Sequence, residues 1–282
     1  APFRVYNDAT VFELPFLEQD SPADHLGLYR REVVSPAPVN PTTLGGFLEL
    51  SLGLSAWKSY GRNRWPLRMN PSSGNLHPTE AYVVIPDAED MDAGVLHYNP
   101  LTHALEMRCR IPESLRNKVR NHFGSRGFMV GLSSIFWRES WKYGERAFRY
   151  CNHDVGHALA ALSISAALQG WKFHCLMGIS DADISQILGF DRTAWHPLES
   201  EHPDLLCDVS VDSHADIPRT LPENLIASFA ELECVGRPNR LSPRREDWEV
   251  IYRVAEDTRK PRTPGERIDF GNRPFLEAAP SG

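Results

Sequence analysis

The sequence contains few cysteines, and none of them forms a Cys-x-x-Cys pair. The 282 residues include five cysteines, which are Cys109, Cys151, Cys175, Cys207 and Cys234. An odd number at wide spacing argues against a disulfide framework and against a zinc knuckle, and it favours a reducing compartment. We therefore expect a cytoplasmic protein.

Long apolar runs and an excess of positive charge are also missing. No stretch of 18 apolar residues occurs, and residues 1–8 lack the basic, apolar and small-residue succession of a signal peptide. The 30 Lys and Arg residues are outnumbered by 37 Asp and Glu, which gives a net charge of −7. This balance does not favour nucleic acid or an anionic membrane surface as a partner.

Motifs of three common enzyme classes are absent. There is no G-x-G-x-x-G that opens a helix after a strand, no P-loop and no G-x-S-x-G elbow, which disfavours a Rossmann dehydrogenase, an NTPase or an α/β-hydrolase. His153 and His157 have the i, i+4 spacing of two metal ligands, but no Glu follows His153 and no third ligand is evident. We predict core polar contacts for these histidines, or for His157 a contact near the subunit interface, and no metal site.

The most informative stretch that is present runs from residue 68 to 85. Pro71 and Pro78 bracket a polar loop, and the β-branched residues after it predict a buried strand. Gly74 has no Cβ, so a ligand can approach its backbone closely. Short donors and acceptors flank this glycine at Ser72, Ser73 and Asn75. A flat polar ring or an anion suits such a loop, although an ordinary Asx or Ser turn uses the same residues.

Hydrophobic periodicity predicts a mixture of strands and helices. Strands are expected near 81–85, 95–98, 105–109, 128–136, 171–177 and 205–211, and helices near 44–54, 111–123, 145–170, 181–188, 222–232 and 245–256. Small and apolar residues occupy almost every side of 158–168, so the longest helix is expected to be buried nearly all round. Residues 1–43 are expected to form an irregular Pro-rich arm, residues 57–64 a connector, and residues 258–282 an extended or disordered arm.

Two blocks resemble the nitroreductase-like flavoproteins. Arg68 and residues 71–80 are similar to the flavin-contacting loop of the SagB-type branch, which includes azoline dehydrogenases. Residues 141–150, followed by 154–157, resemble the Lys-Tyr motif of that branch and the long helix after it. With the segments between them, the resemblance covers roughly residues 44 to 210.

The resemblance implies an α+β fold with three α/β/α layers, a mainly antiparallel central sheet and a long buried central helix. It divides the chain into an N-terminal arm (1–43), an FMN-binding domain (44–215) and a C-terminal helical and extended arm (216–282). It implies a homodimer with FMN near the interface. The implied flavin contacts are Arg68, Pro71, Ser72, Ser73, Gly74 and Asn75, with second contacts from Met177, Gly178 and Ile179.

Lys142 and Tyr143 are the residues expected to handle protons. A partly desolvated lysine can act as a base near neutral pH, and a tyrosine can relay or donate the proton. The resemblance implies that this pair removes a proton from the substrate while flavin N5 takes the hydride. The alternative is that Lys142 extends its ammonium into solvent while Tyr143 packs, as most such pairs do.

Two functional hypotheses follow. The first is an FMN-dependent oxidoreductase acting on a small-molecule or peptide-derived substrate, with NAD(P)H or dioxygen as second redox partner. The second is a flavin-free scaffold or binding module of the same fold; the chain is also compatible with one half of a tandem protein. The Arg-Arg-Ser-x-Arg phosphate motif of the superfamily is missing, because Arg30-Arg31 is followed by Glu32. The phosphate anchor is therefore not assigned.

Overall fold

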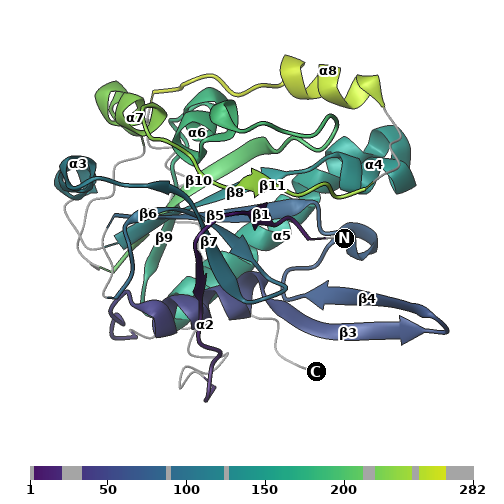
Figure 1. Cartoon of the computed structure of the whole chain (residues 1–282), viewed down its shortest axis with the longest axis horizontal. Coiled ribbons are helices and arrows are strands. Elements are labelled where there is room, and N and C mark those ends of the chain that lie inside the picture. The colour runs from purple at the N-terminus through teal and green to yellow at the C-terminus, as the bar shows by residue number, and fades with distance from the viewer. Residues whose placement is uncertain are drawn as a thin grey trace, which may run out of the picture.

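A seven-stranded antiparallel sheet forms the centre of the computed structural model, which describes residues 3–20, 34–86, 90–123, 127–211, 220–242 and 248–264 (Figure 1). The strand order is β2-β7-β6-β5-β8-β10-β9. The strands are β2 (Val11–Glu13), β5 (Thr79–Ile85), β6 (Gly94–Asn99), β7 (Ala104–Arg110), β8 (Gly127–Ser134), β9 (Lys172–Cys175) and β10 (His202–Ser210). Every residue of β5 is buried, as its β-branched sequence predicts.

Helices cover both faces of this sheet (Figure 1). On one face lie α2 (Pro41–Leu52) and α5 (Ala147–Leu168), and on the other lie α3 (Glu113–Phe123), α6 (Asp181–Leu188) and α7 (Glu223–Ala230). The remaining helical elements are α4 (Trp137–Tyr143), α8 (Glu249–Asp257), η1 (Ser73–Asn75), η2 (Gly144–Arg146) and η3 (Phe190–Arg192). The predicted α+β fold with three layers and an antiparallel central sheet is confirmed.

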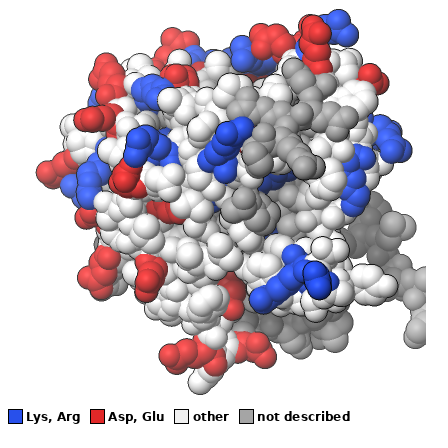
Figure 2. Space-filling model, turned by 45° about the vertical axis from the view of Figure 1, so that its right-hand side comes forward, with Lys and Arg blue, Asp and Glu red and all other residues white. Residues whose placement is uncertain are grey.

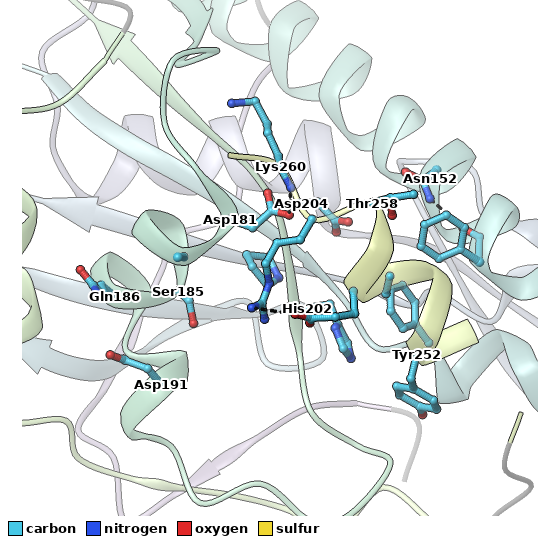
Figure 3. Close-up of a pocket in the computed structure, with 17 residues that line it drawn as sticks. Asn152, Asp181, Ser185, Gln186, Asp191, His202, Asp204, Tyr252, Thr258 and Lys260 are labelled. Atoms are coloured by element: carbon cyan, nitrogen blue, oxygen red, sulfur yellow. Dashed lines mark hydrogen bonds and ion pairs between the residues drawn. The ribbon is translucent and has the colours of Figure 1, made fainter. Parts of the chain in front are cut away.

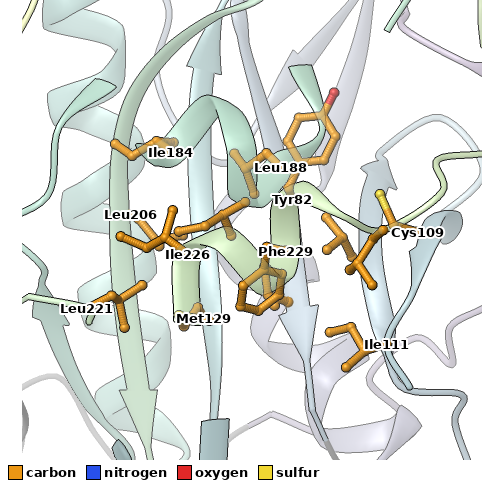
Figure 4. Close-up of a cluster of buried hydrophobic side chains, with 14 of the residues drawn as sticks. Tyr82, Cys109, Ile111, Met129, Ile184, Leu188, Leu206, Leu221, Ile226 and Phe229 are labelled. Carbon is orange, nitrogen blue, oxygen red and sulfur yellow. The ribbon is translucent and has the colours of Figure 1, made fainter. Parts of the chain in front are cut away.

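Each face of the sheet has its own hydrophobic core. Phe47 and Leu162, from α2 and α5, belong to the core on one side. On the other side, Leu188, Leu206 and Phe229 bring α6, β10 and α7 together (Figure 4). Residues 223–230 thus contribute to the main core, although the sequence placed them in a separate C-terminal arm.

Local capping residues explain where two of the helices begin. Asn40 accepts a hydrogen bond from the Thr43 amide, the Thr43 hydroxyl lies 3.1 Å from the Asn40 amide, and Pro41 occupies the first turn of α2. Ser180 and Asp183 form the same reciprocal arrangement at the start of α6. The start of α6 is therefore fixed by its own sequence.

The expectation of an irregular N-terminal arm is wrong for two short segments. β2 pairs with β7 at the edge of the main sheet, with Phe12 opposite Leu105. β1 (Tyr6–Asn7) pairs with β11 (Arg237–Pro238), more than 200 residues later in the chain. Both segments are too short for periodicity to reveal, because their partners supply the hydrogen bonds. Arg30, Arg31 and Glu32 lie outside the described residues.

The predicted connector at 57–64 is instead a β-hairpin. β3 (Leu54–Tyr60) and β4 (Asn63–Arg68) turn at Gly61, and the hairpin projects from the body of the molecule (Figure 1). Its outer residues are exposed, so no apolar alternation marks it in the sequence. The Arg64 guanidinium lies 4.4 Å from the centroid of the Trp57 ring.

The central helix α5 is buried on one side only. Val155, Ala158 and Leu162 face the core, whereas Gly156, His157, Ala160 and Ile164 are exposed, Ile164 by 56%. The expectation of burial nearly all round therefore holds only for the side facing the sheet. His153 and His157 are both exposed, so the core contacts expected for them are not formed.

One disulfide joins Cys109 of β7 to Cys234. These residues are 125 positions apart, so their spacing gave no indication of the pair. The other three cysteines are free. Of the described helices, none is both long and apolar enough to cross a membrane. The face in Figure 2 carries charges of both signs, interspersed with uncharged surface.

Candidate functional site

The loop between β4 and β5 is held in a fixed shape by two anchors. The Ser73 amide and hydroxyl donate to the buried carboxylate of Asp154 on α5, at 3.0 and 3.1 Å. The His77 amide donates to the Ser72 hydroxyl at 2.8 Å. Gly74 and Asn75 adopt left-handed φ values of 64° and 56°, which favour glycine and are tolerated by asparagine. The loop is therefore tied to the central helix.

The structure brings this loop against the predicted proton-handling pair. A Cβ atom placed on Gly74 would lie 2.5 Å from both Lys142 Nζ and Tyr143 Oη. Any larger residue at this position would require the Lys142 or Tyr143 side chain to shift. Lys142 and Tyr143 end α4, a helix that the sequence did not predict. Lys142 is exposed in the single chain, so the desolvation expected for it is not provided by this chain alone.

Beneath the loop lies a buried network of charges centred on Glu80 of β5. Its carboxylate contacts Arg138 of α4, accepts from His97 Nε2 at 2.9 Å and lies 3.9 Å from Arg68. Burial disfavours the charge, but the nearby cations Arg138, His97 and Arg68 hold the pKa of Glu80 well below its usual value. Glu80 is therefore a permanent anion in the core.

His97 is a cation at neutral pH. Its Nδ1 lies 2.9 Å from Glu106, so both ring nitrogens face carboxylates. Burial disfavours the charged form, but the hydrogen bonds to Glu106 and Glu80 raise the pKa of His97 to about 9. Three cations, Arg68, Arg138 and His97, therefore meet two anions. This leaves an excess of one positive charge beneath the loop.

We name the adjacent cavity of about 430 Å³ the arginine cavity. Its polar lining comes from Arg64, Arg68, Asn75, His77, Arg138 and Ser242, and its aromatic walls are Phe3, Trp65, Trp137 and Trp141. Several buried polar atoms have no hydrogen-bond partner among the described residues: Arg68 Nε, Arg138 Nε and Nη2, and both ring nitrogens of His77. Because buried polar groups are almost always paired, these atoms indicate a site for a ligand.

His77 is neutral within this cavity. Burial, together with the charges of Arg68 and Arg138, lowers the pKa of His77 to about 3. A neutral imidazole offers one donor and one acceptor, so His77 can bind the edge of a heterocycle in either direction. The lining therefore suits a flat aromatic ligand with a polar or anionic edge.

Glu139 is a second buried carboxyl that the sequence did not reveal. It is fully buried on α4, and neither carboxyl oxygen has a hydrogen-bond partner. Burial, followed by the nearby Asp154, raises the pKa of Glu139 to about 8, while Lys142 opposes the shift. Glu139 is thus protonated at neutral pH, in contrast to Glu80.

The turn formed by Met177, Gly178 and Ile179 is hydrogen-bonded to the segment that follows α8. The Gly178 carbonyl accepts from the Thr263 amide at 3.1 Å, and the Ile179 carbonyl accepts from Lys260. Met177 is 62% exposed. Among the described residues, no hydrogen bond or ion pair links this turn to residues 68–75. The two predicted halves of the flavin site are thus not joined by such contacts within one chain.

Comparison with curated proteins gives two informative relatives. The trifolitoxin-processing protein TfxB of Rhizobium leguminosarum bv. trifolii is 30% identical over 130 residues, which cover 43% of this chain and 35% of TfxB. A putative nitroreductase of Methanocaldococcus jannaschii, MJ1384, is 24% identical over 187 residues, covering 64% of this chain and 90% of the relative. The alignment thus spans only about a third of TfxB.

Solved structures share the fold. A putative nitroreductase from Anabaena variabilis superposes with a TM-score of 0.64 at 23% identity, covering 93% of this chain and 50% of that chain. The Escherichia coli microcin synthetase McbBCD complex with truncated pro-MccB17 bound gives 0.50 at 18% identity, covering 72% and 78%. At these identities the likeness concerns the fold alone.

The nitroreductase family model matches residues 34–199, which is more than half of the chain. This segment includes the loop at 68–77, the Lys142-Tyr143 pair and the central helix α5. The resemblance inferred from the sequence is confirmed, and it indicates an oxidoreductase. The chain belongs to the nitroreductase family.

Proposed function

We propose that this protein is an FMN-dependent oxidoreductase that passes a hydride between an organic substrate or NAD(P)H and flavin N5. The observation that carries the proposal is the contact at Gly74, where the loop expected to hold flavin meets Lys142 Nζ and Tyr143 Oη. Residues that are 68 positions apart in the chain, with no other reason to meet, would thereby serve one site.

The residues beside the loop fit FMN. A cavity of about 430 Å³ with aromatic walls can take part of a flat tricyclic ring. Unpartnered N–H groups of Arg68 and Arg138 would donate to polar ring atoms or to phosphate, and neutral His77 would supply a further contact. Because Asp154 already engages Ser73, we assign to Ser73 the fixing of the loop and to Pro71, Ser72, Gly74 and Asn75 the approach to flavin.

Bound FMN would supply a two-electron acceptor at N5. Lys142 Nζ would take the proton that leaves the substrate carbon, and the Tyr143 hydroxyl would orient Nζ or relay that proton. Glu139 is neutral at physiological pH, so it forms no ion pair with Lys142 as an ionised carboxylate would. The proton-handling group therefore faces the loop rather than the interior.

Two copies of the chain would complete the site. The exposed strip of α5, formed by Gly156, His157, Ala160 and Ile164, presents small and apolar groups on which a second copy could pack. Pairing there would cover Lys142 and would bring the turn at Met177, Gly178 and Ile179 to the flavin of a neighbouring subunit. We therefore propose a homodimer.

A peptide-derived substrate is the preferred class. TfxB is described as a trifolitoxin-processing protein, and McbBCD was solved with truncated pro-MccB17 bound. The SagB-type likeness of this chain supports the same class, with dioxygen or NAD(P)H as the second redox partner. The same likeness is also compatible with a place in a longer protein, because this chain covers half of the Anabaena chain.

The test begins with purified protein titrated with FMN and followed near 450 nm, roughly where oxidised flavins absorb. We expect a yellow complex in Lys142→Ala as in the unaltered chain, with FMN still bound, and a fall of about 10²- to 10⁴-fold in the rate at which an azoline-containing peptide reduces the flavin, because Lys142 would take the substrate proton in that step. Lys58→Ala is the control, because Lys58 is exposed on the β3–β4 hairpin. A colourless protein that takes up no FMN would instead support the flavin-free scaffold.

A further inference from the structure

A second cavity of about 410 Å³ lies between α6, α8 and the start of β10 (Figure 3). Its lining includes neither the flavin contacts implied by the resemblance nor the Lys142-Tyr143 pair. Figure 3 shows Asp181, Asp204 and Lys260 close together, with His202 and Tyr252 below them. We name this space the carboxylate cavity.

Aromatic rings form one wall of the carboxylate cavity. Phe136 stacks on His202 with ring centroids 4.3 Å apart and an interplanar angle of 24°. The Tyr252 ring lies against both, at 6.2 Å from Phe136 and 5.8 Å from His202. Phe148 of α5 also lines the space. Such a wall suits a flat or alkyl group and, through the electron-rich ring faces, a cation.

The cations that line this cavity already have partners. Lys260 Nζ donates to the Ile179 carbonyl, and Arg259 Nη1 lies 3.3 Å from Glu256 Oε1. Neither side chain needs an anionic ligand to be satisfied. An anion entering the cavity would also meet the carboxyls of Asp181 and Asp204.

Asp204 has no cationic partner. Its hydrogen bond comes from the Ser134 hydroxyl at 2.7 Å, and among the described residues it forms no salt bridge. Burial raises the pKa of Asp204 to about 8 despite the Ser134 hydrogen bond, and Asp181 adds to the rise. His202 Nε2, buried nearby, has no hydrogen-bond partner either. A ligand that carries a positive charge and N–H donors would therefore satisfy both the ionised form of Asp204 and the unpartnered His202 Nε2.

We propose that the carboxylate cavity binds an organic amine in its protonated form, with the ammonium on Asp204 and the apolar part against Phe136, His202 and Tyr252. A primary ammonium offers three donors, enough for Asp204 and for the unpartnered His202 Nε2. The neutral, unprotonated His202 ring provides the acceptor, because burial and then Arg259 lower the pKa of His202 to about 4.

The affinity should depend on pH, because the charged ligand requires the ionised form of Asp204. The charged or titratable groups around Asp204 are Asp181 of α6, Asp191 after α6, His202 of β10, Cys151 of α5, Tyr252 and Glu256 of α8, and Arg259 and Lys260 after α8. Below a pKa of about 8, binding must displace the proton on Asp204. We expect the association constant to rise about tenfold per pH unit from 6 to 7 and to level off above 8.

The test uses calorimetric titration of the 282-residue chain, with and without FMN. The probes are phenethylammonium chloride and its neutral counterpart 2-phenylethanol. We expect the cation to bind about 10- to 100-fold more tightly, as for a charge-assisted hydrogen bond. Asp204→Asn should remove this preference. Asp191→Asn is the matched control, because Asp191 lines the same cavity but is paired with Arg192 at 2.9 Å.

Equal affinity for the two probes would overturn the proposal. So would a preference for the cation that survives in Asp204→Asn, or an association constant that does not change between pH 6 and 7. The comparison of probes on the unaltered chain does not depend on the folding of any variant. Failure of FMN to bind would overturn the proposed oxidoreductase but would leave this inference standing.

Discussion

The two cavities of this protein differ in how their charges are balanced. The arginine cavity has buried cations in excess, with guanidinium N–H groups that lack partners. The carboxylate cavity has cations that the chain itself satisfies and a carboxyl, Asp204, that it does not. The charge left unbalanced on each wall indicates which ligand it can hold: anionic or electron-rich edges in the first, ammonium in the second.

The pKa values of buried carboxyls follow the same contrast. Glu80, beside Arg138, His97 and Arg68, remains ionised. Asp204 forms no salt bridge with any described residue, and burial raises its pKa to about 8. The direction of the shift is thus decided by neighbours from other elements rather than by the residue type.

Breaking the charge network of the arginine cavity should have the largest effect. Arg138→Met leaves Glu80 buried without its closest cation, so we expect a loss of about 3–5 kcal/mol in the free energy of unfolding. Urea denaturation measures it. The control is Arg237→Met, which breaks the pair with Asp8, whose two side chains are 82% and 69% exposed. That change should cost about 0–1 kcal/mol. Equal losses in the two variants would show that the buried Glu80 network contributes no more to stability than an exposed ion pair.

The protonation of His97 should make the stability of the arginine-cavity network depend on pH. The pKa of His97 is raised to about 9 in the folded protein, so its stabilising contribution is complete below pH 6.5 and is lost as pH rises through 9. We expect the free energy of unfolding to fall by up to about 3 kcal/mol across this range. His97→Gln should remove most of the pH dependence in urea denaturation at pH 6.5, 8 and 9.5. An unchanged slope in that variant would assign the effect to other groups.

Removing the buried carboxyl of Asp204 from the carboxylate cavity should have the opposite effect and raise the free energy of unfolding. Asp204 has a raised pKa, so its contribution is complete below pH 4 and is lost as pH rises through 8. Asp204→Asn keeps an acceptor for Ser134 and removes the charge. We expect a stabilisation on the order of 2 kcal/mol at pH 9 and almost none at pH 4, less than the full shift because the cavity admits solvent. Thermal unfolding at both pH values measures this difference. A variant less stable than the unaltered chain at pH 9 would contradict the prediction.

The smallest effect on stability concerns the loop beside the arginine cavity. Gly74→Ala places a methyl group 2.5 Å from Lys142 Nζ and Tyr143 Oη and strains a φ of +64°. Gly61→Ala is a matched control, because its φ is +59° and nothing lies within 4 Å of the added methyl group. Both should lose about 1 kcal/mol from backbone strain. Only Gly74→Ala should also weaken FMN binding, by about tenfold or more, in a fluorescence titration. Equal FMN affinities in the two variants would show that the loop does not contact the cofactor.

Much of the architecture could be predicted from local sequence. The β-branched run of β5, the capping residues of α6 and the length of α5 all act within one element, so periodicity located them. The short strands β1 and β2 and the exposed hairpin β3–β4 were missed, because their pairing depends on partners elsewhere in the chain or lacks a buried face. For the same reason the Cys109–Cys234 disulfide could not be inferred from spacing.

The sequence by itself determined the elements with a regular buried face, such as β5 and α5, together with the glycine at position 74 and the Lys142-Tyr143 pair, because each depends on residue type and near neighbours. Only the tertiary structure decided that this glycine lies beside that pair, that Glu80 meets two arginines and a histidine, and that Asp204 forms no salt bridge with a described residue. Charge balance in a buried site is a sum over segments far apart in the chain. It exists only once the chain has folded.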